Sequence, residues 1–334
     1  MGSRADEAEA RQGADGALRL GVVGVGHFGR YHAEKMAALD GARLVAVADS
    51  DRARAADVAA RLSTEAAPDH RALLGRIDAA SVAVPAAAHY RVVRDFLDAG
   101  IHVLVEKPFT ERVDNAEELT ALAGAKGLVL QVGLIERFSE AFRTVAPRIT
   151  RPVYMEAVRI SPFSPRGTDV SVVLDMMIHD IDIILALVDA PVAEVDAVGA
   201  PVFSASEDIA NARLKFANGC IANVTASRVS LKTERTLRIF QPDVYVKVDH
   251  GERSVRVARR KEGDAPLTGP DGVTLEHLRF EKGDALRREI ESFAHAVRTG
   301  GVPAVTGADG VRSLEVAHRI TASIQENRAR LDLA

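Results

Sequence analysis

The sequence predicts an α/β protein in which an N-terminal domain with a doubly wound parallel sheet precedes an α+β domain with a mostly antiparallel open sheet. Three observations predict this: the length, an alternation of apolar runs and helical patterns in the first half, and a succession of strand-like runs in the second. A chain of 334 residues suits two domains better than one core. We expect a disordered lead-in over 1–17, a first domain over 18–140 and a second over 141–334.

The first half alternates short apolar runs with helical patterns. Helices are expected over 28–39 and 87–99, and Gly100 suits the C-cap of the second. Apolar strands that alternate with helices indicate a parallel sheet covered on both faces. The predicted strands are LRLGVVGVG from Leu18, 43–49, 80–85, 101–108 and 128–133.

The second half places strand-like runs one after another with short turns, which predicts the antiparallel sheet. Asn218-Gly219 predicts a hairpin, because both residues can take positive φ. A long apolar helix is expected over about 169–188, an irregular segment over 261–283, and closing helices over about 284–299 and 309–327. The predicted strands are 152–160, 208–217, 220–229, 235–241, 244–250 and 254–260.

Composition excludes several functional classes. A net charge of −4 argues against a large basic surface, so no nucleic-acid partner is expected. No membrane partner is expected either, because the most apolar stretch, 170–188, carries several ionisable residues. The single cysteine, Cys220, rules out an internal disulfide and suits a reducing compartment. The lead-in lacks the apolar core of a secretion signal, so a cytoplasmic protein is expected.

GVGHFG (24–29) follows a predicted strand and opens a predicted helix, with the G-x-G-x-x-G spacing. Gly24 permits a tight turn, Gly26 lets the backbone approach a pyrophosphate, and Gly29 lets helix and strand pack closely. The helix N-terminus attracts the phosphate charge. The pattern predicts a dinucleotide-binding Rossmann domain, and a glycine turn without a ligand is the alternative.

Asp49 favours the dinucleotide interpretation. It ends the second strand, twenty residues after Gly29, where an acid binds the hydroxyls of the adenosine ribose. A carboxylate there also repels a 2′-phosphate, so we predict NAD over NADP. Arg52 and Arg54 lie close in sequence and can soften that preference.

VLVEKP delivers Glu106 and Lys107 to the carboxyl end of a strand, the edge where open α/β sheets bind ligands. A lysine there can accept a proton or donate a hydrogen bond if its surroundings lower its pKa. Pro108 is a candidate for a cis peptide bond. A surface ion pair before a loop is the alternative.

A polar stripe on the apolar helix is the most informative feature. At about 100° per residue, Asp175, His179 and Asp182 fall within a sector of about 60° on a helix that is otherwise almost entirely apolar. Burying such groups costs several kcal/mol unless they are paired or hydrogen-bonded. Three interpretations remain: a satisfied buried network, a metal site, and a general acid–base pair in which Asp175 polarises His179. We favour the last and expect no metal ion, while Asp180 points elsewhere and is expected to be structural.

These segments, in this order and spacing, resemble the Gfo/Idh/MocA family, named for glucose–fructose oxidoreductase and inositol dehydrogenase. The resemblance runs from about Leu18 to the C-terminus. It is carried by GVGHFG, VAVPAAAHY with Pro85 and His89, AGIHVLVEKPF, DMMIHDID, and the ending FAHAVRTGGVPAVTGADGVRSLEVAHRITAS.

The resemblance implies an NAD(P)-binding Rossmann domain and a second domain whose open sheet face forms the contacts of a homodimer or homotetramer. It also implies that Lys107, Asp175 and His179 work at the substrate. A hydride goes to the nicotinamide while a side chain removes the hydroxyl proton. Family members differ in which side chain is this base. We favour His179, with Lys107 bonded to the reacting oxygen. The expected cofactor contacts are Gly24, Gly26, His27, Phe28, Gly29, Asp49, Pro85, His89, Glu106 and Lys107.

Candidate substrate contacts are less specific. Arg137 follows the last strand of the first domain, and Arg159 and Arg228 lie on strands of the second. Each guanidinium can hold a diphosphate bidentately, although a structural or solvated arginine is the more common case. Asp182 is the remaining candidate for a contact with the substrate.

Many family members carry a Gly-rich segment before the Asp, whereas this chain has GTDVSVVLD. With the DMMIHDIDIIL run, this variant is more similar to a bacterial nucleotide-sugar branch. The resemblance therefore implies oxidation of UDP-N-acetylglucosamine at C3. The 3-keto product is a substrate for amination, a step used in making lipid A with amide-linked acyl chains.

Other functions stay open from the sequence. The same fold serves inositol and free-aldose dehydrogenases, a linear-tetrapyrrole reductase and an NAD-using glycosidase. A non-catalytic NAD-binding sensor is the alternative of another class. Intact Lys107, Asp175 and His179 argue against a sensor, which has no need of a buried acid–base pair.

Overall fold

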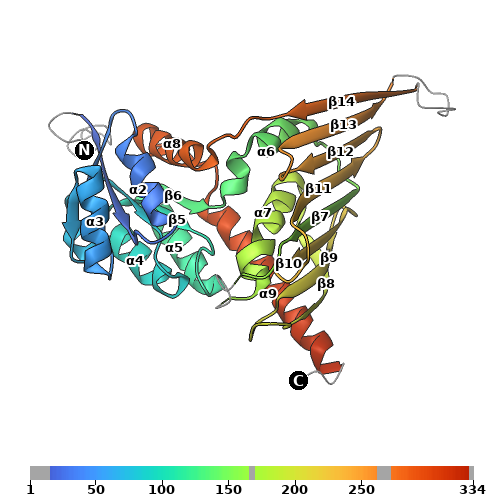
Figure 1. Ribbon diagram of the computed structural model, residues 1–334, viewed down its shortest axis with the longest axis horizontal. Helices are drawn as coiled ribbons and strands as arrows, with labels where there is room; N and C mark the ends of the chain where they lie inside the picture. The colour runs from blue at the N-terminus through green and yellow to red at the C-terminus, as the bar shows by residue number, and fades with distance from the viewer. Residues whose placement is uncertain (1–15, 165–169, 262–271, 331–334) are drawn as a thin grey trace. The chain divides into compact units, whose positions relative to one another are not determined.

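The computed structural model in Figure 1 describes residues 16–164, 170–261 and 272–330. These residues form two compact units. The N-terminal unit runs to Ile135 and includes Ala285–Val311, and the C-terminal unit comprises Glu136–Asp284 and the residues from Arg312 onward. The predicted lead-in over 1–17 lies almost entirely outside the described residues.

The N-terminal unit is built on a six-stranded parallel sheet in the order β3-β2-β1-β4-β5-β6, the order of doubly wound dinucleotide-binding folds. The predicted parallel sheet is confirmed. The strands are β1 (Leu18–Val23), β2 (Ala42–Ala48), β3 (Glu65–Ala67), β4 (Ala79–Val82), β5 (His102–Glu106) and β6 (Leu130–Gly133). Its helices are α2 (Gly29–Ala37), α3 (Arg52–Leu62), α4 (Ala86–Asp98), α5 (Val113–Lys126) and α8 (Ala285–Thr299).

The N-terminal unit includes α8, which lies far beyond residue 140, where the sequence predicted that the first domain ends. Ile290 and Phe293 of α8 are buried in one apolar cluster with Leu20 of β1 and Met36 of α2. An apolar helix face must be covered, and here the covering surface is that of the parallel sheet with α2. Strand β3 also escaped the sequence analysis, because three residues are too few to show a period.

The C-terminal unit contains an eight-stranded sheet in the order β14-β13-β12-β11-β7-β10-β9-β8. Only the β7–β10 pair is parallel, so the mostly antiparallel prediction is confirmed. The strands are β7 (Tyr154–Ile160), β8 (Val192–Ala200), β9 (Ile209–Phe216), β10 (Ile221–Ser227), β11 (Glu234–Gln241), β12 (Val244–Asp249), β13 (Ser254–Arg260) and β14 (Val273–Arg279).

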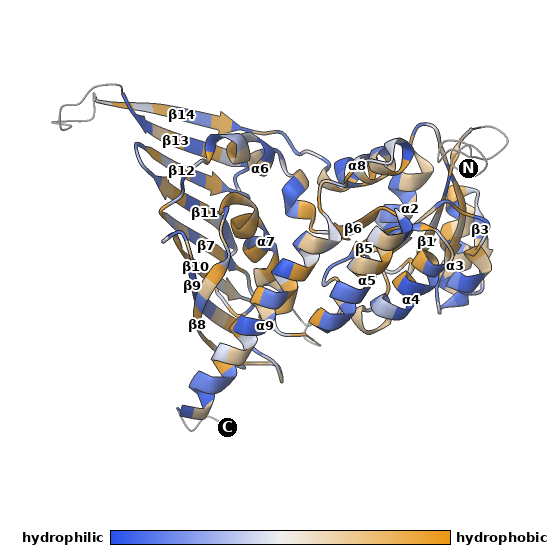
Figure 2. Cartoon of the chain, turned by 180° about the vertical axis from the view of Figure 1, so that it is seen from behind, coloured by the Kyte–Doolittle hydropathy of each residue, from blue (hydrophilic) through white to orange (hydrophobic). Residues whose placement is uncertain are grey.

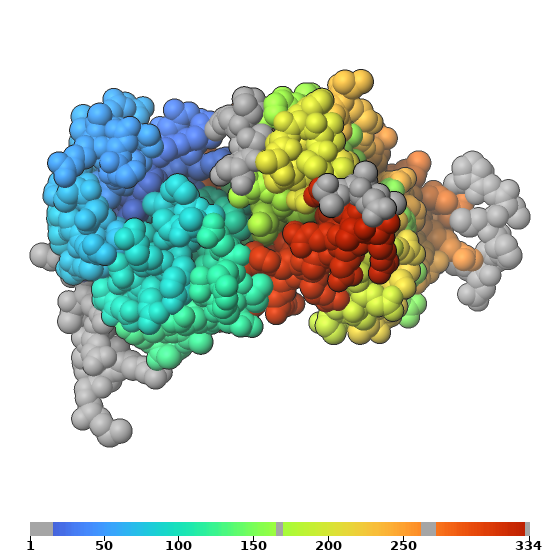
Figure 3. Space-filling model, turned by 90° about the horizontal axis from the view of Figure 1, so that it is seen from below, coloured from blue at the N-terminus to red at the C-terminus, as the bar shows by residue number. Residues whose placement is uncertain are grey.

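One face of this sheet is covered and the other is open. Hydrophilic and hydrophobic residues alternate along the strands (Figure 2), and the inward side chains of β9 and β10 are buried in the core of the unit. The core is completed by α6 (Glu140–Val145), the segment Val173–Leu187 and α9 (Gly307–Arg330). The side chains of Ser323 and Asn327 on α9, drawn red in Figure 3, bond to the backbone of Ala197 on the edge strand β8.

Two edge strands were missed by the sequence analysis. Residues 273–279, expected to be irregular, form β14, and 192–200 form β8. Both strands are largely exposed, so they lack the apolar period that marks a buried strand. They are strands because each is hydrogen-bonded to a neighbouring strand, β8 to β9 and β14 to β13. The β9–β10 hairpin is confirmed, although only Gly219 of its turn has positive φ, while Asn218 accepts the Cys220 N–H. Among the described helices, none has the length and apolarity that crossing a bilayer requires.

Candidate cofactor and active site

The glycine loop joins β1 to α2, and the structure confirms why glycine is needed. Gly24 has φ +82°, and a Cβ there would lie 2.5 Å from the carbonyl oxygen of Ala83. A Cβ on Gly29 would lie 1.7 Å from the carbonyl oxygen of Gly24, so only glycine permits this close approach of helix and loop. Above Gly26 the space is open apart from Arg54 Nη1 at 3.7 Å.

This loop and the start of α2 fit a dinucleotide pyrophosphate. No side chain caps the N-terminus of α2, and its first turn carries no acidic residue. The helix dipole favours negative charge at this end, while the N–H groups of Arg30 and Tyr31 already donate to the carbonyl oxygens of Gly26 and Phe28. His27 and Phe28 lie exposed at the tip of the loop. When bound, NAD supplies the acceptor for a hydride.

Asp49 lies immediately after β2 and holds the glycine loop. Its carboxylate is buried and accepts the Val25 N–H at 2.8 Å and the Asp51 N–H at 2.9 Å. The exposed guanidinium of Arg54 lies 3.4 Å from the same carboxylate. A positive group thus stands beside the acid predicted to select NAD, as the sequence had suggested.

The Glu-Lys-Pro turn follows β5, and its Lys107–Pro108 peptide bond is cis, as the sequence suggested. His89 of α4, which begins directly after Pro85, is buried against this turn. Its Nδ1 lies 2.9 Å from the Pro108 carbonyl oxygen and its Nε2 lies 2.8 Å from the Val84 carbonyl oxygen. Burial lowers the pKa of His89.

His89 was predicted to contact the cofactor, and the structure gives it a different part. Both of its ring nitrogens face backbone carbonyls of the protein, so neither is directed at a ligand. His89 therefore positions the turn that carries Lys107. Glu106, predicted in the same set, directs its carboxylate to His32 Nε2 at 2.8 Å.

The apolar helix of the C-terminal unit starts as a π-helix over Val173–Met177 and continues as α7 (Ile178–Leu187). The wider first turn means that the 100° spacing assumed from the sequence does not apply around Asp175, and π turns often occur at functional sites. Most of the helix is buried, whereas Asp175 and His179 are only partly buried. These two residues therefore retain the access that a reactant needs.

The other two acids of the helix are used by the protein itself. Asp182 is fully buried and forms a bidentate pair with Arg137, at 2.7 and 2.8 Å. Asp180, expected to be structural, forms a bidentate pair with Arg159, at 2.7 and 3.0 Å. The helix thus carries two partly buried ionisable residues, Asp175 and His179, and two acids that form ion pairs, Asp180 and Asp182.

The candidate substrate arginines have buried protein partners. Arg159 and Arg228 are almost fully buried, and Arg228 donates from Nε to Asp208 at 2.7 Å. A guanidinium held this way has most of its donors directed at the protein, and contact of Arg159 and Arg228 with a diphosphate stays a prediction. The side chain of Arg137 is more exposed than those of Arg159 and Arg228, although its guanidinium faces Asp182. Its contact with substrate stays a prediction.

Glu136 is a site residue that the sequence analysis did not identify. It accepts from Arg159 Nη1 at 3.0 Å and lies 3.5 Å from His250. Burial alone would raise its pKa, but the charges of Arg159, His250 and His179 lower the pKa of Glu136 to about 2. A permanent negative charge therefore lies near His179. In the sequence, Glu136 stands one residue before Arg137 in LIERF, and no pattern there distinguishes it from an ordinary surface acid.

A cavity of about 480 Å³ opens elsewhere, near the N-terminal ends of β1, β4 and β5. Arg19, Asp78 and His102 are among its lining residues. The glycine loop, Asp49 and Lys107 lie at the opposite, carboxyl ends of the strands, where doubly wound sheets bind their ligands. The cavity is therefore not the cofactor site.

Comparison with known proteins agrees with this description. A family model described as "Oxidoreductase family, NAD-binding Rossmann fold" matches residues 18–134, and a model of the GFO/IDH/MocA C-terminal domain matches 154–244. The fold, the glycine loop and these matches define an NAD-binding oxidoreductase.

Similarity to individual proteins extends over nearly the whole chain. UDP-N-acetylglucosamine 3-dehydrogenase of Acidithiobacillus ferrooxidans is 38% identical over 309 residues, covering 92% of this chain and 97% of that protein. Its solved structure has a TM-score of 0.87 and covers 93% of this chain and 98% of that one. The scyllo-inositol 2-dehydrogenase (NAD(+)) of Bacillus subtilis is 27% identical over 332 residues, covering 92% of this chain and 94% of that protein.

A third comparison shows the fold alone. The scyllo-inositol dehydrogenase of Lactobacillus casei, solved with bound NAD(H) and scyllo-inositol, is 19% identical with a TM-score of 0.77, covering 93% of this chain and 98% of that one. Taken together, the family models and the 38% relative establish that the chain belongs to the Gfo/Idh/MocA family of oxidoreductases.

Proposed function

We propose that this enzyme oxidises a ring hydroxyl of a nucleotide sugar to a ketone, with UDP-N-acetylglucosamine and its C3 hydroxyl as the preferred substrate. The observation that supports oxidation best is that Asp175 and His179 are only partly buried on a mostly buried apolar helix, in a chain with an NAD-binding Rossmann domain. The choice of substrate draws on the Acidithiobacillus relative, whose similarity spans nearly the full length of both chains.

The site residues divide the chemistry between them. His179 accepts the proton of the reacting hydroxyl, Asp175 orients His179, and the carbon-bound hydrogen leaves as a hydride to the cofactor. Lys107 donates a hydrogen bond to the reacting oxygen. Charge on Glu136 favours the protonated imidazole that this proton transfer produces. The 3-keto product suits a following amination, the step used for lipid A with amide-linked acyl chains.

A substrate panel tests this proposal. The protein is mixed with NAD and, separately, UDP-N-acetylglucosamine, other UDP-sugars, inositols and free aldoses, and reduced cofactor is followed by its absorbance. We expect the highest kcat/KM with UDP-N-acetylglucosamine. Preference for an inositol would favour the second candidate, an inositol dehydrogenase, which relatives at 24–27% identity keep open. Cofactor binding with no turnover on any compound would favour a sensor.

Asp49→Asn is expected to weaken the preference for NAD over NADP by about tenfold or more, equivalent to about 1.4 kcal/mol. The amide oxygen of Asn can still accept the Val25 N–H, whereas its Nδ2 cannot accept the Asp51 N–H. The charge that repels a 2′-phosphate is lost, and Arg54 remains. The measurement is kcat/KM with each cofactor.

Asp51→Asn is the matched control for this test. Asp51 is an exposed residue two positions further on, and its side chain accepts the Arg54 N–H as the N-cap of α3. Asn caps helices equally well but loses the 3.1 Å ion pair of Asp51 with Arg54, so we expect a much smaller change in cofactor preference than for Asp49→Asn. A preference for NADP in the wild-type enzyme would contradict the role given to Asp49.

We also propose that the open face of the eight-stranded sheet joins subunits into a homodimer or homotetramer. Tyr154, Phe240 and Tyr245 make ring contacts with one another on adjacent strands of that face, and Phe240 is exposed. Exposed aromatic groups of this kind favour a protein partner. Sedimentation velocity on the wild-type protein measures the oligomeric state, and a monomer at micromolar concentration would contradict this proposal.

We also propose a cytoplasmic location, since the one cysteine is a buried free thiol.

A further inference from the structure

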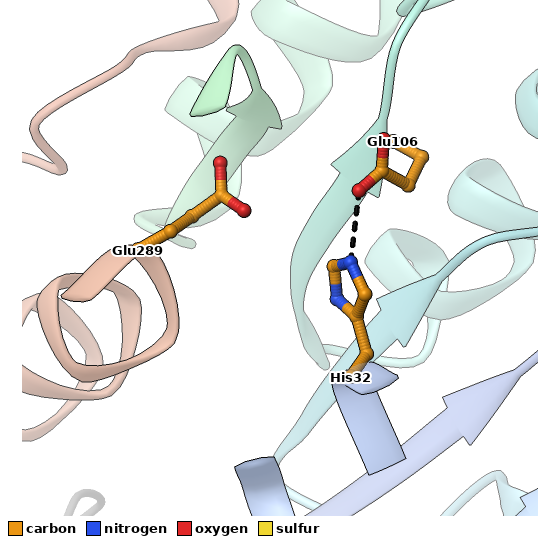
Figure 4. A group of neighbouring side chains, drawn as sticks. All are labelled: His32, Glu106 and Glu289. Carbon is orange, nitrogen blue, oxygen red and sulfur yellow. Dashed lines mark hydrogen bonds and ion pairs between the residues drawn. The ribbon is translucent and has the colours of Figure 1, made fainter. Parts of the chain in front are cut away.

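Two buried side chains and one partly buried side chain converge in the N-terminal unit without any part in the proposed reaction. Figure 4 shows His32 of α2, Glu106 at the end of β5 and Glu289 of α8 directed toward one another. One nitrogen or oxygen atom from each lies within 4.8 Å of the others. His32 Nε2 and Glu106 Oε1 are 2.8 Å apart.

Glu289 is the member that calls for an explanation. Its side chain is 0% exposed, and neither carboxylate oxygen has a hydrogen-bond partner among the described residues. Burial, and then the charge of Glu106, raise the pKa of Glu289 well above its usual value. Burying a polar group without a partner is costly, so a carboxyl kept in this place indicates a missing partner.

Neighbouring groups orient the side chains of His32 and Glu106 and bond the backbone of Glu289. His32 Nδ1 contacts Ser81 Oγ at 2.9 Å, which leaves Nε2 directed to the centre of the cluster. The Lys107 N–H donates to Glu106 Oε2 at 3.2 Å, and Gln131 Nε2 donates to the Glu289 carbonyl oxygen at 3.1 Å. A second bond that fixes the imidazole and the carboxylate is the arrangement found around metal ligands.

Glycine at position 133 leaves room for this arrangement. Gly133 lies opposite Glu106 on the neighbouring strand, and a Cβ there would lie 3.2 Å from the Glu106 carboxyl carbon. The side chain of Glu106 is 18% exposed, so one member of the cluster borders solvent.

We propose that His32, Glu106 and Glu289 bind a divalent transition-metal ion such as Zn²⁺, through one imidazole nitrogen and one oxygen from each carboxylate. The charges balance, because two carboxylates and a neutral imidazole offset a dication. Ligand atoms around tetrahedral Zn²⁺ at about 2.1 Å are about 3.4 Å apart, so the side chains need to move by about an ångström or less. One further position stays free for water.

Such an ion would stabilise the end of β5, where Glu106 precedes Lys107. It would also tie together three elements, α2, β5 and α8, that lie far apart in the sequence. The proposed role of the ion is structural. Its binding therefore requires neither NAD nor a sugar and can be tested independently of the proposed function.

The test is titration of metal-stripped, full-length protein with Co²⁺, a spectroscopic substitute for Zn²⁺, followed by visible absorption and by elemental analysis after dialysis. We expect one ion per chain and a higher thermal midpoint with metal. Glu289→Gln and His32→Gln should each weaken binding at least tenfold. His70→Gln is the matched control, because His70 is a buried histidine of the same unit that pairs instead with Asp95.

Three results would overturn the proposal: no Co²⁺ or Zn²⁺ bound by the wild-type protein at millimolar concentration, undiminished binding by folded Glu289→Gln, or loss of binding in His70→Gln. Circular dichroism of each variant establishes that it is folded. If Glu289→Gln does not fold, Glu106→Gln takes its place, and the wild-type stoichiometry remains decisive alone.

Discussion

Replacing His179 by Ala is expected to lower kcat about 10²–10⁴-fold, the usual contribution of a general base. NAD affinity should stay close to that of the wild type, because the glycine loop and Asp49 belong to the N-terminal unit whereas His179 lies in the C-terminal unit. Steady-state kinetics with UDP-N-acetylglucosamine and titration of NADH fluorescence measure the two quantities.

His277→Ala is the control for this experiment. His277 is an exposed histidine on the edge strand β14, so its loss should leave kcat unchanged. Glu136→Gln offers a finer comparison, because it removes a nearby negative charge while keeping His179. A kcat for His179→Ala equal to that of the wild type would remove this residue from the mechanism and leave Lys107 as the candidate base.

Replacing Asp208 by Ala is expected to lower the free energy of unfolding by about 3–5 kcal/mol, as for other buried ion pairs that lose one partner. Asp208 is fully buried and accepts from Arg228 Nε, from the Ser204 hydroxyl and from three backbone N–H groups of residues 202–204. Its loss leaves the buried charge of Arg228 without this carboxylate. Guanidinium denaturation monitored by circular dichroism measures the change.

The pH dependence of this effect has a definite sign. Burial would raise the pKa of Asp208, but the hydrogen bonds to Ser204, Arg228 and the backbone outweigh it and hold the pKa below its usual value. The stabilisation is therefore present above about pH 4 and is lost as the pH falls below that value. The free energies of unfolding of wild type and Asp208→Ala should converge in acid.

Glu194→Ala provides the matched surface control. Glu194 pairs with Lys215 between exposed side chains of β8 and β9, and such pairs contribute about 1 kcal/mol or less. In a double-mutant cycle, Asp208→Ala with Arg228→Ala should cost less than the sum of the single changes, because the double variant buries no unpaired charge. Additive costs would show that the two residues do not act as a pair.

Much of the fold was predictable from short-range patterns. Apolar runs that alternate with helices predicted the parallel sheet, and the closely spaced strands 208–217 and 220–229 predicted the hairpin of β9 and β10. Strands β3, β8 and β14 escaped because they are short or exposed. A strand that buries little shows no period, and it is identified only by the partner to which it is hydrogen-bonded.

The candidate site was predictable to a similar depth. The glycine spacing and Asp49 predicted the cofactor loop, and the structure shows a local steric demand for glycine at positions 24 and 29. The polar stripe predicted a role at the substrate for Asp175, His179 and Asp182 alike. Only the bidentate pair with Arg137, 45 residues away in sequence, distinguishes Asp182 from Asp175 and His179, the residues proposed to react.

The sequence by itself determined the class of fold, the glycine loop and the helix that carries an acid and an imidazole. These depend on residue size, backbone freedom and periodicity, which act over a few neighbouring residues. The tertiary structure decided which polar groups meet: Asp182 with Arg137, Asp180 with Arg159, and Glu106 with His32, 74 residues apart. Electrostatic pairing depends on distance in space, and a linear pattern does not contain that distance.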